Sequence, residues 1–166
     1  MLSDPIFRLF HVTDRADSDR LFPKTFTRET VDGDKWIRFR DGQNFYPVCH
    51  PVKQEDPERH RFHRRDFFQI IFILSGAGEQ ISRQSAASPQ KRDRIRAGDV
   101  LFVPPMLSHH LLPLAAGLQL LTLSFRPSAL FYPDEILRDP KRLTPFPLLS
   151  PFFCDPASPA FLHPPK

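Results

Sequence analysis

Four polar side chains that could contact a small molecule occur in two short stretches of the sequence. HRRDFFQ supplies His63, Arg65 and Gln69, and PPMLSHH supplies His109. Imidazole and amide groups both donate and accept hydrogen bonds, and a guanidinium binds a carboxylate or phosphate through parallel hydrogen bonds. These residue types favour an anionic or polyhydroxylated ligand.

The first three of these residues have the spacing of one face of a strand. The stretch that begins at His63 continues as a Phe- and Ile-rich run that ends at a glycine, which is typical of a buried strand. Side chains of one parity share a face, so His63, Arg65 and Gln69 lie on the same side as Ile71 and Ile73. If the isoleucines face the interior of a barrel, the polar residues line its mouth. Apolar walls with a few convergent polar groups are the usual form of a ligand site.

The second stretch predicts a rigid corner. A Gly-Asp turn precedes the short apolar strand VLFV, and Pro104 and Pro105 follow that strand. We expect the two prolines to fix the exit of the chain and to direct His109 into the same mouth. His110 has the opposite parity, and we expect it to be a solvent-facing turn residue.

Simpler roles are open for several of these charges. Arg65 could point into solvent or pair with Asp66 or Asp99. The basic stretches ERHRFHRR and KRDRIR could contact phosphates, but charged loops are ordinarily just solvated. With a net charge of only +4, the composition gives weak support for a nucleic-acid partner.

The elements that position these residues are predicted to be short strands. The chain has 166 residues, of which 19 are prolines, and proline disrupts helix interiors. Many short strands separated by turn signals predict one all-β domain, either a sandwich or a barrel. Cys49 and Cys154 are too few and too far apart for a disulfide framework, so we expect both to be reduced in a cytoplasmic protein. We expect no signal peptide, no membrane span and no membrane partner.

Three segments in order resemble one known family. HRRDFFQIIFILSGAG, IRAGDVLFVPPMLSHH and LQLLTLSFRP resemble the cupin-type N-terminal effector-binding domain of AraC-type transcriptional regulators, over about residues 35–153. The resemblance implies a cupin-like double-stranded jelly-roll barrel with short peripheral helical turns. It also implies a small-molecule effector in the barrel pocket, contacted by His63, Arg65, Gln69 and His109.

The same resemblance predicts the organisation of the chain. Residues 1–34 would form an N-terminal arm and first strands, 35–130 the barrel, and 131–166 a proline-rich extension leading to a DNA-binding domain. Nothing in these 166 residues resembles that domain, so contact with DNA is expected only through a part absent from this sequence. We favour a sensor domain of a longer regulator over a stand-alone relative. The sequence leaves the oligomeric state open, and a homodimer is one option.

A metal-dependent cupin enzyme of the dioxygenase or isomerase type is the alternative. The ligand pattern of metal-binding cupins, laid on this sequence, falls on His63, Arg65, Gln69 and His109. A guanidinium cannot ligate a metal ion, and Gln69 stands where a carboxylate is expected. His60 lies three residues from His63 and therefore on the opposite face of a strand. We expect no metal, no cofactor and no catalytic residue.

Overall fold

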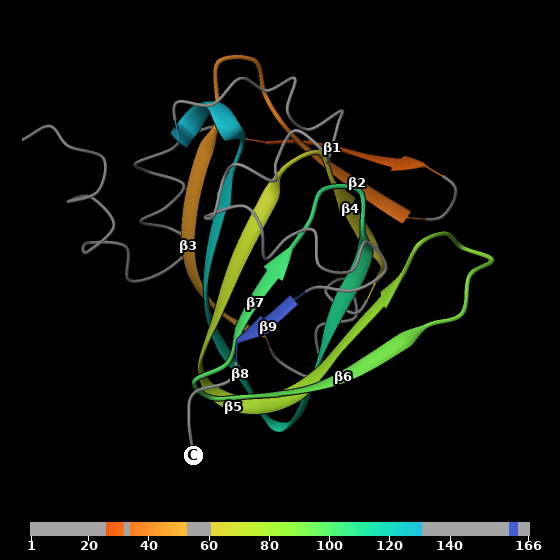
Figure 1. The fold of residues 1–166 in the computed structure, drawn as a ribbon, viewed down its shortest axis with the longest axis vertical. Helices are drawn as coiled ribbons and strands as arrows, with labels where there is room; N and C mark the ends of the chain where they lie inside the picture. The colour runs from red at the N-terminus through yellow and green to blue at the C-terminus, as the bar shows by residue number, and fades with distance from the viewer. Residues whose placement is uncertain (1–25, 32–33, 53–60, 131–159, 163–166) are drawn as a thin grey trace, which may run out of the picture.

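The computed structural model describes residues 26–31, 34–52, 61–130 and 160–162. Within these ranges the chain forms strands almost throughout, and they curl into a half-barrel (Figure 1). The all-β, cupin-like fold predicted from the sequence is confirmed. The elements are β1 (Phe26–Val31), β2 (Asp34–Phe39), β3 (Phe45–Val52), β4 (His63–Arg65), β5 (Phe68–Arg83), β6 (Lys91–Arg96), β7 (Val100–Val103), β8 (Ser108–Phe125), the short 3-10 helix η1 (Pro127–Leu130) and β9 (Ala160–Leu162).

The two longest strands, β5 and β8, form the backbone of the sheet. They pair antiparallel from Phe68↔Phe125 to Arg83↔Ser108. The sheet order is β1-β2-β4-β8-β5-β7-β9, with β3 paired to β8 and β6 paired to β5. The β1–β2 hairpin joins this frame through β4, which runs parallel to β2 and pairs with β8 at His63↔His109. The hairpin is therefore attached along a short stretch of chain.

A sharp bend in β5 allows it to follow β8 around the half-barrel. The register shifts between Ile73 and Ser75 and again between Gly76 and Gly78. Gly76 has φ +86°, and a Cβ atom there would lie 2.1 Å from the carbonyl oxygen of Gly117. Only glycine fits this conformation and this close approach, because a side chain would meet the opposite backbone.

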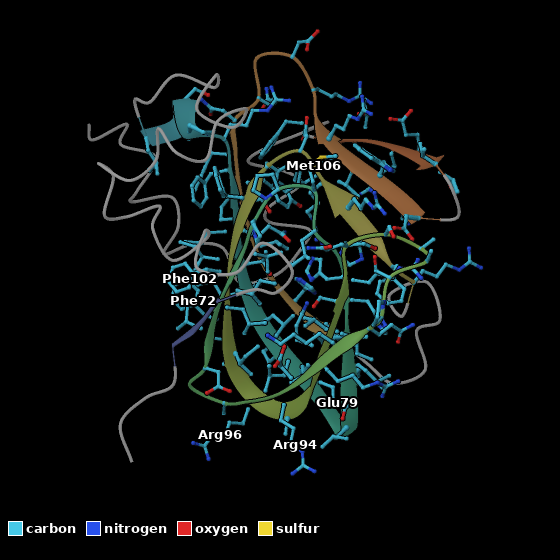
Figure 2. All side chains as sticks on the ribbon, turned by 45° about the vertical axis from the view of Figure 1, so that its right-hand side comes forward. Phe72, Glu79, Arg94, Arg96, Phe102 and Met106 are labelled. Atoms are coloured by element: carbon cyan, nitrogen blue, oxygen red, sulfur yellow. The ribbon has the colours of Figure 1, made fainter. Side chains whose placement is uncertain are left out.

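Alternation along the strands separates an inner from an outer face. The predicted inward orientation of Ile71 and Ile73 is confirmed, since the two side chains are 3% and 2% exposed. Phe72, between them in sequence, lies with Phe102 on the outer face beside β9 (Figure 2). The inner face contains an aliphatic cluster that includes both isoleucines and an aromatic cluster of Phe39, Tyr46, Val48 and Phe67.

The predicted division of the chain into three parts concerns its two ends. Residues 1–25 and 131–159 lie outside the described residues, so the division into arm, barrel and extension stays a prediction. Ala160–Leu162, within the predicted extension, pairs with β7 as strand β9. No helix in the described ranges is both long and apolar enough to span a bilayer.

A candidate ligand cavity lined by cations

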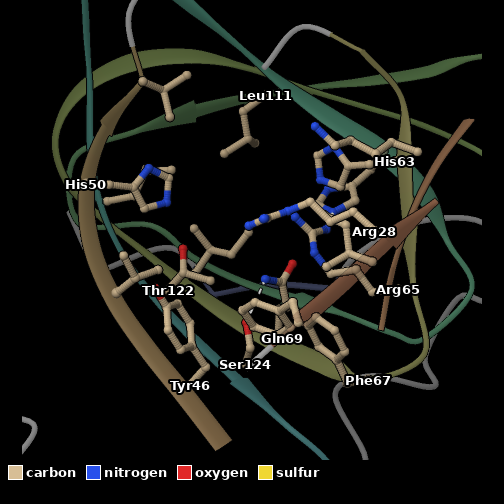
Figure 3. Close-up of a pocket in the computed structure, with 18 residues that line it drawn as sticks. Arg28, Tyr46, His50, His63, Arg65, Phe67, Gln69, Leu111, Thr122 and Ser124 are labelled. Atoms are coloured by element: carbon tan, nitrogen blue, oxygen red, sulfur yellow. Dashed lines mark hydrogen bonds between the residues drawn. The ribbon is translucent and has the colours of Figure 1, made fainter. Parts of the chain in front are cut away.

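A cavity of about 220 Å³ opens on the inner face of the half-barrel (Figure 3). Its walls are formed by residues of β1, β2, β3, β4, β5 and β8. Strands that are far apart in the sequence therefore line the same cavity. His63, Arg65, Phe67, Gln69 and Ile71 line it at alternate positions, as expected for one face of an extended chain. Aromatic and aliphatic side chains form most of the remaining wall.

The structure brings together all four of the side chains expected at the site. His63, Arg65 and Gln69 come from β4 and β5, and His109 comes from β8. The backbone pairing of β4 with β8 places the rings of His63 and His109 at a centroid distance of 4.6 Å. Their arrangement around one cavity supports the predicted role in binding, and that role itself stays a prediction.

Arg65 is a partly buried cation without a carboxylate partner among the described residues. Its guanidinium donates to Nε2 of His109. The alternative partners are used elsewhere, because Asp66 accepts from Arg126 at 2.8 Å and Asp99 accepts from the backbone of Arg96 at 2.9 Å. Burial lowers the pKa of Arg65 to about 9, so the group stays charged at neutral pH.

The turn after β7 fixes the backbone at Arg65. After the two prolines, Met106 adopts φ 68°, a left-handed conformation that is unusual for a residue with a side chain. Its backbone N–H donates to the carbonyl oxygen of Arg65 at 2.8 Å. Met106 lies at one end of the half-barrel, whereas Glu79, Arg94 and Arg96 lie at the other (Figure 2). The predicted rigid corner therefore positions Arg65 as well as His109.

His109 is held as a neutral imidazole. Because Nε2 accepts from Arg65, the ring proton is on Nδ1, which faces the side-chain amide of Gln80. Gln80 must then turn its oxygen toward His109, so that Nδ1–H donates to Oε1. Burial, followed by the nearby charges of His63 and Arg65, holds the pKa of His109 well below its usual value.

His63 offers an acceptor that no described side chain or backbone group uses. Its Nδ1 lies 3.1 Å from the carbonyl oxygen of Arg61, so this nitrogen carries the proton and donates. Nε2 is then an unprotonated acceptor, and it is buried without a hydrogen-bond partner in the described part of the chain. Burial, followed by the charge of Arg65, holds the pKa of His63 well below its usual value.

Gln69 has a similar unused atom. The side chain is 5% exposed, and its Nε2 donates to the hydroxyl of Ser124 at 2.9 Å. Its Oε1 is buried and has no partner among the described residues. Buried polar atoms are nearly always hydrogen-bonded, so two such acceptors on one cavity wall indicate that a hydrogen-bond donor of a ligand or water binds there.

Three further basic residues line the cavity that were not predicted from the sequence. Arg28 and Lys35 come from the β1–β2 hairpin, and His50 comes from β3. Arg28, His63 and Arg65 lie on one side of the cavity, and His50 lies on the opposite side (Figure 3). Arg28 follows Phe26 with the spacing of one strand face, but the sequence predicts an arm and first strands for residues 1–34 rather than a pocket wall.

A buried ion-pair network holds β4 in place beside the cavity. Asp34 is 2% exposed and accepts from Arg64 at 2.9 Å, from Arg83 and from the hydroxyl of Ser108 at 2.7 Å. Burial tends to raise the pKa of Asp34, but the bonds from Ser108, Arg83 and Arg64 outweigh it and lower the pKa. Arg64 faces this network, and so its neighbours His63 and Arg65 face the cavity.

The expectation for His110 was wrong. His110 belongs to β8, is 8% exposed and packs edge-on against Phe62 at a centroid distance of 4.7 Å. The parity argument was correct, since only His109 faces the cavity. However, β8 already begins at Ser108, and its other face is covered by Phe62 and Arg83 rather than by solvent.

The described residues do not form a metal site of the cupin type. They contain no group of three or more His, Cys, Asp or Glu side chains placed to hold an ion. His63 and His109 are close, but the guanidinium of Arg65 occupies Nε2 of His109. The donor set therefore fits a polar organic ligand better than a divalent cation.

The sequence of residues 47–164 matches the AraC-like ligand binding domain family. The chain belongs to this family. The match extends from within β3 to the end of β9, and it includes all three strands that carry the four predicted contact residues, namely β4, β5 and β8. The AraC-like domain thus contains the cavity wall formed by His63, Arg65, Gln69 and His109.

Solved structures resemble the AraC-like domain at low sequence identity. Hydroxypropylphosphonic acid epoxidase from S. wedmorenis, in complex with fosfomycin, overlaps with a TM-score of 0.44 and 15% identity over 62% of this chain and 57% of that one. Oxalate decarboxylase from B. subtilis overlaps with a TM-score of 0.41 and 16% identity over 63% and 28%. The chain thus spans little over half of the first enzyme and under a third of the second, and these likenesses carry no inference about activity. No curated protein sequence matches this chain.

Proposed function

We propose that this chain is the small-molecule-sensing regulatory domain of a cytoplasmic AraC-type transcriptional regulator. The observation that carries the proposal is the 220 Å³ cavity of an AraC-like ligand binding domain, with unused polar atoms of His63 and Gln69 on its wall. The effector binds in this cavity without being transformed. It controls a DNA-binding domain that lies outside these 166 residues.

The attachment of the β1–β2 hairpin suggests how binding changes the domain. The hairpin supplies Arg28 and Lys35 to the cavity, whereas β5 and β8 supply Gln69 and His109. Between them lies β4, which has three residues. A ligand that contacts both sides favours the conformation in which they approach, and it shifts the population by its differential affinity. This conformation would then be transmitted to the DNA-binding part.

Thermal unfolding of the protein in the presence of fractionated metabolites tests the proposal. An effector at 100 times its Kd adds about 2.7 kcal/mol to the free energy of unfolding. For a domain of this size that raises Tm by roughly 5–10 °C. The matched variants are Val48→Phe, which fills the cavity wall, and Arg94→Gln, which changes an exposed position on β6.

The expected result is a fraction that stabilises the wild-type protein and Arg94→Gln but not Val48→Phe. If no fraction stabilises the wild-type protein, the chain is a dimerisation module rather than a sensor. The proximity of His63 and His109 keeps a metal-dependent enzyme as the second candidate. Near-stoichiometric metal in the purified protein, lost in His63→Ala, would favour that enzyme over a sensor.

A further inference from the structure

We infer that the effector is a short hydroxycarboxylic acid whose carboxylate binds Arg65 and Arg28 and whose hydroxyl donates to Nε2 of His63. This inference rests on the proposed function, because it assumes that the cavity binds a small molecule. The charge of the wall, the unused acceptors and the size of the cavity support it independently.

The charge of the wall is one-sided. The described lining residues include Arg28, Lys35 and Arg65 but no Asp or Glu. Four arginines in the described ranges are partly buried, namely Arg64, Arg65, Arg83 and Arg126. Three of them pair with a buried or partly buried aspartate, at N–O distances between 2.5 and 2.9 Å. Arg65 is the exception.

A partly buried guanidinium without a counter-ion is costly, because the charge has lost part of its hydration. Arg65 uses one nitrogen toward His109, and its fork has further donors. Arg28 reaches the same side of the cavity and, within the described part of the protein, forms no ion pair. A ligand carboxylate between the two arginines would supply the missing negative charge with the geometry that guanidinium groups prefer.

The unused acceptors require a second group on the ligand. A carboxylate has no hydrogen to donate, so it cannot satisfy Nε2 of His63 or Oε1 of Gln69. A hydroxyl can donate to either of these atoms. Since His63 lies on the same strand as Arg65, two residues away, the hydroxyl belongs close to the carboxylate.

The size of the cavity restricts the ligand further. The cavity is smaller than the ~300–1,000 Å³ of sites for drug-sized ligands. Phe26, Tyr46, Phe67 and Leu111 form an apolar part of the wall, which suits a short carbon chain. A short hydroxy acid satisfies these limits together with the charge and the hydrogen bonds.

Calorimetric titration of the complete chain with matched probes tests the inference. Glycerate carries both groups, propionate lacks the hydroxyls, glycerol lacks the charge, and glycerol 3-phosphate replaces the carboxylate with a phosphate. A longer pair, gluconate and sorbitol, makes the same comparison at larger size. We expect at least one hydroxy acid to bind about tenfold or more tightly than each matched probe that lacks a group, since hydrogen bonds to charged groups have this magnitude.

Two variants locate the contacts. Arg28→Gln removes a cation from an exposed position of β1, so the fold is expected to persist, and binding of the hydroxy acid should weaken about tenfold. Arg38→Gln is the matched control, because Arg38 is an exposed arginine of the same hairpin that pairs with Glu29. It should leave binding unchanged. His63→Phe should abolish the preference for glycerate over propionate.

The inference is overturned if polyols bind as tightly as hydroxy acids, if simple carboxylates do, or if glycerol 3-phosphate binds more tightly than glycerate. It is also overturned if all these probes fail while another metabolite fraction stabilises the wild-type protein but not Val48→Phe. In that last case the sensing function stands and only the ligand class is wrong. If no fraction of any kind stabilises the protein, the sensing function fails as well.

Discussion

At the scale of single residues, the burial of two histidines in the cavity wall makes the stability of the folded protein depend on pH. Their folded-state pKa values lie well below the usual 6.5, because burial and the charge of Arg65 disfavour the imidazolium of His63 and His109. In the unfolded chain the same residues bind protons near pH 6.5. The free energy of unfolding therefore has its full value above pH 6.5. It decreases as the pH falls from 6.5 toward the folded-state pKa values, because the unfolded chain then binds protons that the folded protein does not.

We predict a decrease in the free energy of unfolding of up to about 1.4 kcal/mol per pH unit for each histidine below pH 6.5. Urea denaturation between pH 7.5 and 5.5 measures this slope. His109→Gln should reduce the slope, because one of the two titrating groups is gone. A free energy of unfolding that does not change over this range would show that the imidazoles are hydrated in the folded protein.

The second prediction at this scale concerns Asp34. Asp34→Asn leaves the guanidinium groups of Arg64 and Arg83 near a neutral side chain, and removal of one member of a buried ion pair costs about 3–5 kcal/mol. Urea denaturation at pH 7 checks this. Glu79→Gln is the control, because its partner Arg92 is 57% exposed and such pairs contribute roughly 0–1 kcal/mol. Equal losses in the two variants would contradict the assigned role of Asp34.

At the scale of elements, the bend of β5 depends on one glycine. Gly76→Ala places a Cβ 2.1 Å from the carbonyl oxygen of Gly117 and also requires an alanine at φ +86°. Overpacking costs about 1–3 kcal/mol and the left-handed conformation about 1–2 kcal/mol, so we predict a total loss of about 3 kcal/mol or more.

Gly42→Ala is the matched control for the bend. Gly42 has φ +76° but nothing within 4 Å of an added Cβ, so the loss should be limited to about 1–2 kcal/mol. Thermal and urea unfolding of both variants give the comparison. If Gly76→Ala is no more destabilising than Gly42→Ala, the close approach of β5 to β8 does not constrain the fold.

The sequence predicted strongly patterned elements well and weakly patterned ones poorly. The run from His63 to Ile73 has clear alternation, and its buried isoleucines were predicted correctly. His63, Arg65 and Gln69 line the cavity at alternate positions, and their role as ligand contacts stays a prediction. The strand FTRETV has no such alternation, so the contribution of Arg28 to the cavity was missed. The error at His110 had another cause, because the Phe62 ring that covers it comes from a segment 48 positions away in the chain, and local patterns do not specify such contacts.

At the scale of the whole molecule, the cavity lies where the hairpin meets the main sheet. The β1–β2 hairpin is held by β4, by the Asp34 network and by the aromatic cluster around Phe39. The cavity is lined by Arg28 and Lys35 of the hairpin and by side chains of β8 such as His109. A bound effector would add contacts across this junction, and so its effect on the domain should be largest there.

Backbone hydrogen exchange, measured with and without the stabilising metabolite fraction, tests this account most directly. Amide exchange reports local opening of each strand. We predict that the effector slows exchange most in β1, β2 and β4 and in the part of β8 that begins at Ser108, with little change in β6. Protection confined to β6 and β7, with none in β1, β2 or β4, would contradict binding of the effector in this cavity.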